Sequence, residues 1–180
     1  GLAIFILSWI CMDVIQATLL YFIKYWLRLE SESDLVMGVI FGTAILALPL
    51  WAWVSRRWSK RWAYIAGVAF WAVVQIVLVT VSPTTGLPVI LFLCVLGGVG
   101  VAAAHVLPWA IIPDAIEWDE WKSGKRHEGL FYSLTTLAHK AASSIAVPLA
   151  LLVLEVTGYV PNLAQQQPSA LMGLRIVMGP

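Results

Sequence analysis

Long apolar stretches alternate along the chain with short polar segments. Five stretches are long enough to cross a bilayer as helices, because a hydrocarbon core of about 30 Å needs roughly 20 residues at 1.5 Å each. They cover approximately residues 2–27, 35–54, 62–81, 87–112 and 130–154, and a sixth stretch runs from 170 to 180. The pattern therefore predicts an all-α, polytopic membrane protein.

The polar segments between the stretches contain turn-forming residues, as in Ser82-Pro-Thr-Thr-Gly86 and in the segment from Thr157 to Pro168. The chain starts inside its first apolar stretch and stops about 11 residues into its sixth. Such ends cannot be satisfied in lipid. We therefore expect a piece of a longer protein.

The composition agrees with a membrane protein. Hydrophobic residues make up 61% of the chain and charged residues 12%, whereas soluble domains have about 45–50% and about 25%. The net charge of +1 is too small for a phosphate-binding surface, so no nucleic-acid partner is expected. Cys11 and Cys94 lie inside apolar stretches, and no metal-ligand cluster is visible. The catalytic patterns HExxH, GxSxG and the P-loop are absent, so we expect no enzyme.

Basic residues gather in two of the polar segments, which lie on the same side of the membrane. They are Arg56, Arg57, Lys60 and Arg61 in segment 55–61, and Lys122, Lys125 and Arg126 in segment 113–129. Positive charge in short loops marks the cytoplasmic side. We expect a multi-pass protein of the plasma (inner) membrane, with these two segments in the cytoplasm.

The segment 113–129 resembles a separate short helix. Asp114 stands where an N-cap would, and Glu117 takes the capping-box position three residues later. Trp118 and Trp121 are three residues apart, which suits an amphipathic helix lying at the membrane surface. The charges would then be solvated or, in a second interpretation, would form a gate of ion pairs.

Two polar residues lie deep inside apolar stretches. Lys140 lies about ten residues into the fifth stretch, where a charge costs roughly 2.5–3.5 kcal/mol on insertion scales. It would line a solute route, or pair with a carboxylate of a neighbouring helix. His105, in the fourth stretch, would contact substrate or form a bond between helices. His139 points about 100° away from Lys140 on a helix, and we expect it in the core.

The first stretch carries a polar pair. Asp13 and Gln16 are three residues apart and therefore share a helix face. They would line the same route, or Asp13 would be the partner of Lys140.

Several strings occur in a familiar order across the chain. They are LPWAIIPD at 107–114, GKRHEG at 124–129, FYS at 131–133, Lys140, and GYVP at 158–161. Together they resemble the glycoside–pentoside–hexuronide:cation symporters of the major facilitator superfamily, of which the melibiose permeases are members. The resemblance covers essentially the whole chain, as the C-terminal six-helix bundle of a twelve-helix transporter with its last helix truncated.

The resemblance implies a secondary active transporter. It would carry a sugar or glycoside together with Na⁺ or H⁺ by alternating access, with the bilayer and an N-terminal six-helix half as its other partners. No cofactor is implied, and the cation site is expected in the N-terminal half. A lysophospholipid symporter of the same family, or a non-transporting membrane scaffold or sensor, remains an alternative.

The resemblance also implies roles for single residues. Lys140 matches an intramembrane lysine near the substrate and cation sites, whereas His105 stands where melibiose permeases have a pocket tryptophan. Charged residues of the cytoplasmic side match a gate that closes when the pocket faces outward. These gate residues are Asp114, Glu117, Glu120 and Arg126, with Arg57 as a basic partner from segment 55–61.

Overall fold

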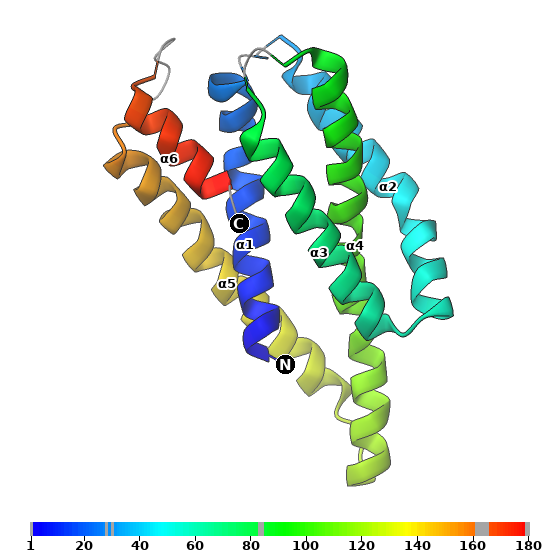
Figure 1. Ribbon diagram of the computed structural model, residues 1–180. Helices are drawn as coiled ribbons and strands as arrows, with labels where there is room; N and C mark the ends of the chain where they lie inside the picture. The colour runs from blue at the N-terminus through cyan, green and yellow to red at the C-terminus, as the bar shows by residue number, and fades with distance from the viewer. Residues whose placement is uncertain (1, 28, 30, 83–84, 161–165, 179–180) are drawn as a thin grey trace.

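The computed structural model describes residues 2–27, 29, 31–82, 85–160 and 166–178, and within them every regular element is a helix (Figure 1). The elements are α1 (Leu2–Tyr21), the π-helix η1 (Phe22–Trp26), α2 (Ser33–Arg57), α3 (Lys60–Thr80), α4 (Leu87–Ser123), α5 (Glu128–Val156) and α6 (Pro168–Met178). Five helical spans of this part of the chain are long and apolar enough to cross a membrane. The prediction of an all-α, multi-pass membrane protein is confirmed.

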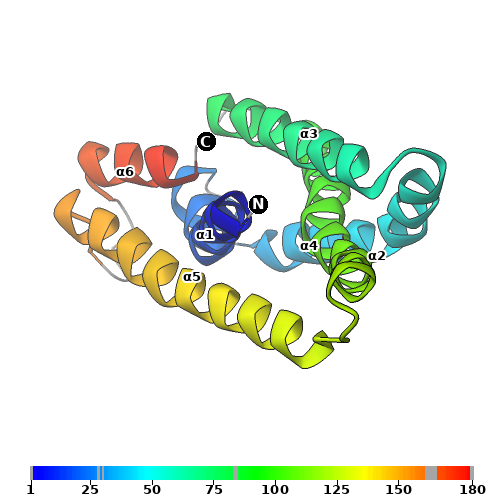
Figure 2. The ribbon, with the colours of Figure 1, turned by 90° about the horizontal axis from the view of Figure 1, so that it is seen from below.

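The helices form two groups that meet along α4 and α1. In one group α4 packs between α2 and α3, and in the other α1 packs against α5 and α6. Figure 2 shows α1 at the centre of the arrangement, with α5 running along one side of it. Two predicted segments are described only in part, since 161–165 of the polar segment 157–168 and 179–180 of the sixth stretch lie outside the described residues.

Small residues bring α4 close to both of its neighbours. A methyl group added at Gly98 would lie 2.5 Å from the carbonyl oxygen of Ile40 in α2, and one added at Gly100 would lie 2.6 Å from Trp71 in α3. Such contacts leave no space for a side chain, so the helix backbones approach closely, as small residues permit in membranes. We call this contact the small-residue seam; its members are Gly67, Gly98, Gly100, Ala102 and Ala103.

The expected break at Pro113 is wrong, because α4 runs on without interruption to Ser123 and extends beyond the neighbouring helices (Figure 1). Proline removes one backbone hydrogen bond but does not always end a helix. Here Ile112 and Ile116, four residues apart, are both buried, so packing holds one face of the continued helix. The segment expected to form a separate amphipathic helix is thus the end of α4. The helix ends at Gly124, whose φ of 68° suits glycine.

Candidate functional site

The packing of α1 against α5 brings two pairs of side chains face to face. Trp9 and Asp13 are four residues apart on α1, and His139 and Ser143 are four apart on α5, so each pair lies on one helix face. The Trp9 and His139 rings have centroids 4.1 Å apart. One turn further along, the Ser143 hydroxyl donates a short hydrogen bond to Asp13 Oδ2. The carboxylate inside the span therefore has a partner on α5.

His105 of α4 joins the same group of side chains. Its Nε2 lies 3.2 Å from Gln16 Nε2, and its Nδ1 lies 3.2 Å from the carbonyl oxygen of Val101. An amide nitrogen only donates and a carbonyl only accepts, so this geometry corresponds to a neutral imidazole that carries its proton on Nδ1. The Trp9 ring also meets His105 edge to face, with centroids 5.5 Å apart.

These contacts define the polar cluster between α1, α4 and α5. Its members are Trp9, Asp13, Gln16, His105, His139 and Ser143. Asp13, Gln16 and His105, all chosen from the sequence, come together as candidates for one site. Trp9, His139 and Ser143 were not chosen for it. The two four-residue spacings could have revealed them, but only if the pairing of α1 with α5 had been known.

Lys140 lies beside the polar cluster and not within its hydrogen bonds. Asp13 bonds to Ser143 instead, and no ion pair of Lys140 occurs among the described residues. The expected Asp13–Lys140 pair is therefore not formed. Lys140 is exposed on the surface of this chain, 12 residues after α5 begins, which is about 18 Å along the helix. Its depth near the middle of the span agrees with the prediction.

The exposed surface of α5 has two faces of different character. Ser133, Thr136 and Ser144 accompany Lys140 on one of them, and all four side chains are exposed. We call this row the α5 polar stripe. The other exposed face carries large apolar side chains, for example Ile145, which is 57% exposed. A helix in contact with lipid all round would not carry such a stripe.

An open groove of about 660 Å³ continues this surface at the ends of two spans. Its walls come from the end of α1 and η1 on one side and from the end of α5 on the other. Tyr159 lies with its ring centroid 5.5 Å from the rings of both Tyr21 and Tyr25. Burial, with a hydrogen bond to Tyr25, raises the pKa of the Tyr159 hydroxyl. The groove also receives Lys24 and Glu155, so it is aromatic with charged groups at its edge.

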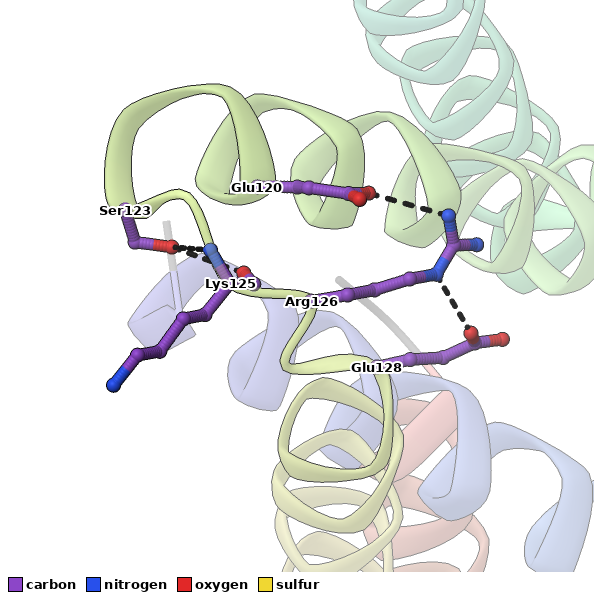
Figure 3. A network of polar contacts seen from close by, with 5 residues as sticks. All are labelled: Glu120, Ser123, Lys125, Arg126 and Glu128. Carbon is purple, nitrogen blue, oxygen red and sulfur yellow. Dashed lines mark hydrogen bonds and ion pairs between the residues drawn. The ribbon is translucent and has the colours of Figure 1, made fainter.

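Within the described part of the chain, the residues predicted to form the gate take part in two separate sets of ion pairs. Lys60 Nζ at the start of α3 lies 2.5 Å from Asp114 Oδ1 of α4. Figure 3 shows the second set, in which Arg126 lies 3.2 Å from Glu120 and 3.1 Å from Glu128. The hydrogen bond to Glu128 and the two carboxylate charges raise the pKa of the Arg126 guanidinium.

These pairs differ from the expected gate in their partners. Asp114 does reach the basic segment 55–61, but through Lys60 and not Arg57. Arg126 binds glutamates close to it in the sequence rather than Asp114. Glu117 and Arg57 are exposed and form no ion pair within the described part of the chain. Asp114 lies inside α4, so it is not the N-cap that the sequence indicated.

Comparison with known proteins identifies relatives of this chain. A Synechocystis protein named an uncharacterized symporter is 31% identical over 99% of this chain and 34% of its own length. A putative sulfoquinovose importer of Salmonella typhimurium is 33% identical over 83% of this chain and 29% of its own. A sodium-dependent lysophosphatidylcholine symporter of Danio rerio is 29% identical over 97% of this chain and 33% of its own length.

The chain thus spans about a third of the length of the curated relatives that it matches. Residues 2–179 match the family described as MFS/sugar transport protein. That match agrees with the all-helical membrane fold and with the resemblance found in the sequence. The chain belongs to the MFS/sugar transport protein family.

Proposed function

We propose that this chain is the C-terminal half of a plasma-membrane symporter that carries a sugar or glycoside together with Na⁺ or H⁺. It would work with an N-terminal six-helix half, the two halves rocking about a site near the middle of the membrane. The observation that carries the proposal is the exposed Lys140 in the middle of α5, in line with a stripe of hydroxyl groups and beside the polar cluster.

The solvation of Lys140 favours a solute route over contact with lipid. An exposed ammonium near the middle of the bilayer costs several kcal/mol if it faces lipid. Ser133 and Ser144 of the α5 polar stripe donate to carbonyl oxygens within α5, but in lipid their hydroxyl oxygens would still lack a donor. A face covered by a second helical bundle, with water and solute between the two, removes both penalties. Lys140 and the polar cluster therefore support a solute route on this side of α1 and α5.

The groups along this route suit a hydroxylated solute. Gln16, Asp13 and His105 offer donors and acceptors that could exchange their present bonds for bonds to hydroxyl groups. Trp9 is buried between the two histidines and would hold them in place beside the solute. Lys140 would bind a hydroxyl or an anionic substituent. We place the coupling cation in the N-terminal half.

Substitution of the lysine tests the proposal. In the full-length protein, Lys140→Ala should abolish concentrative uptake and leave the amount of inserted protein unchanged. Ile145→Ala, on the apolar exposed face of the same helix, is the matched control and should transport normally. Uptake by Lys140→Ala at the level of Ile145→Ala would contradict the route proposed here.

A lysophospholipid is the second candidate substrate. It is favoured by the Danio rerio relative, which is named as a symporter of lysophosphatidylcholine. The two substrates differ in one measurable respect, because an amphiphile must reach the route from the bilayer and a sugar from water. Proteoliposomes containing the full-length protein should take up a labelled sugar from solution and ignore lysophosphatidylcholine supplied in the membrane. The reverse result would establish the lipid function.

A further inference from the structure

The short turn between α2 and α3 carries two tryptophans that the solute route does not use. Trp58 follows the end of α2, and Trp62 lies in the first turn of α3, where its backbone N–H donates to the Ser59 hydroxyl at 3.4 Å. Their side chains are 64% and 63% exposed. Exposed tryptophan at the end of a span is typical of the boundary between acyl chains and headgroups. The turn therefore lies at the depth where lipid headgroups meet the protein.

A groove of about 620 Å³ opens between these tryptophans and continues along α3. Past Ser59, its floor is formed by Ile65, Ala66 and Ala69. This is the outer face of α3, because Gly67 and the rest of the opposite face are buried toward α4. Small residues between bulky ones leave a shallow channel that runs along the helix from the turn toward the membrane interior.

Three arginines of the same turn stand close to the two tryptophans in the sequence and have no partner of opposite charge among the described residues. Arg56, Arg57 and Arg61 are all exposed, and none forms an ion pair with any carboxylate in the described part of the chain. Lys60, the fourth cation of this turn, is already matched by Asp114 at 2.5 Å. The turn that carries the apolar channel thus also carries three uncompensated positive charges.

We propose that this groove binds an anionic glycerophospholipid of the adjacent leaflet. The phosphate would contact the guanidiniums of Arg56, Arg57 and Arg61, which bind phosphate oxygens in a forked geometry. One acyl chain would lie along Ile65 and Ala69, between the two indoles. A zwitterionic lipid brings its own cation to the arginines and binds less well, whereas a soluble anion gains nothing from the channel.

Two ordinary roles of these arginines make a different prediction. Basic residues in a cytoplasmic loop orient a membrane protein, and basic residues in the last turn of a helix such as α2 complement its dipole. Neither role discriminates between lipids once the protein has been purified. Selective binding of an anionic lipid therefore separates the proposed site from both.

The test uses the full-length protein in detergent, where membrane orientation no longer matters. Native mass spectrometry would follow retention of dioleoylphosphatidylglycerol and of dioleoylphosphatidylcholine. The combined variant Arg56→Gln, Arg57→Gln and Arg61→Gln should bind phosphatidylglycerol at least about tenfold more weakly than wild type. The combined variant Lys122→Gln, Lys125→Gln and Arg126→Gln loses the same charge at the other basic segment and should bind as wild type does.

The channel is tested separately from the charges. Trp58→Ala with Trp62→Ala should also weaken phosphatidylglycerol binding several-fold, whereas Trp53→Ala, which removes another exposed indole of α2, should not. Equal retention of the two lipids by wild type would overturn the proposal. So would an equal loss of phosphatidylglycerol in the arginine variant and its lysine-containing control, since general attraction alone would then account for binding.

Discussion

Helix α4 contacts α2 and α3 on one side and α1 and α5 on the other. The two contacts differ in the kind of residue that forms them. The small-residue seam consists of glycine and alanine, and a single added methyl group would collide with Ile40 or Trp71. The polar cluster consists of two histidines, a carboxylate, an amide, a hydroxyl and one indole held by hydrogen bonds and ring contacts. Both lie at the depth of the hydrocarbon.

The difference shows how the two sides meet the constraints of a membrane. In lipid no hydrophobic effect drives the helices together, because the solvent is itself apolar. The close fit of the seam stabilises them through dispersion contacts instead. The cluster contains hydrogen-bonding groups to which a solute could bind. We infer that the seam holds α2, α3 and α4 as a rigid body. In the proposed transport cycle, the side chains of the cluster would exchange their hydrogen-bond partners.

Between these two contacts, the largest expected effect is at the carboxylate of the cluster. Asp13→Ala removes a hydrogen bond to a charged group, worth about 1.5–3 kcal/mol, and should lower uptake at least about tenfold. The thermal stability of the purified protein should change far less than uptake. Asp13→Asn keeps an acceptor for Ser143 and should retain more transport than Asp13→Ala. Equal loss of stability and of uptake would place Asp13 in the scaffold instead.

The next effect, on the seam, should be of the opposite kind. Gly98→Ala forces a methyl group against Ile40 and Thr43, and such overpacking costs about 1–3 kcal/mol. Thermal unfolding in detergent should therefore begin at a lower temperature, while each folded molecule still transports. Gly97→Ala is the control on the neighbouring residue, since its methyl group would meet no atom within 4 Å. Similar unfolding temperatures for the two variants would contradict a tight seam.

A smaller effect is expected at the neutral hydrogen bond of the cluster. Gln16→Ala removes the donor to His105 Nε2, a bond worth about 0.5–1.5 kcal/mol. We expect the substrate concentration for half-maximal uptake to rise by roughly two- to tenfold, with expression unchanged. Cys11→Ala, also exposed on α1, serves as control. An unchanged concentration dependence would remove Gln16 from the site.

The smallest effect should come from the exposed ion pair at the predicted cytoplasmic end of the seam. Lys60 and Asp114 are 36% and 53% exposed, so the pair contributes no more than about 1 kcal/mol. If it closes a gate, Asp114→Lys should slow uptake modestly, and Asp114→Lys combined with Lys60→Asp should recover part of the rate. Arg126→Asp in place of Lys60→Asp should give no recovery, because Arg126 binds Glu120 and Glu128.

Much of the fold followed from the apolar pattern because lipid imposes a simple rule. A chain in hydrocarbon must satisfy its backbone within each helix, so five spans were predicted with ends close to those of α1 to α5. The exception was Pro113, where local preference indicated a break and the packing of Ile112 and Ile116 prevented it. The charged partners at the cytoplasmic end also differed, because a choice between Arg57 and Lys60 depends on where α3 begins against α4.

The sequence by itself determined that the chain crosses the membrane and that Asp13, His105 and Lys140 lie at a depth where polar groups are costly, since both conclusions depend only on residue type and distance along a helix. Only the tertiary structure decided that Asp13 bonds to Ser143 rather than Lys140, and that Trp9 lies against both His105 and His139. Those choices depend on the rotation and sliding of α1 against α4 and α5. A shift in the sequence register of one helix by a single residue turns its contact face by about 100°. The spacing of residues within one helix does not show how that helix is rotated against its neighbours.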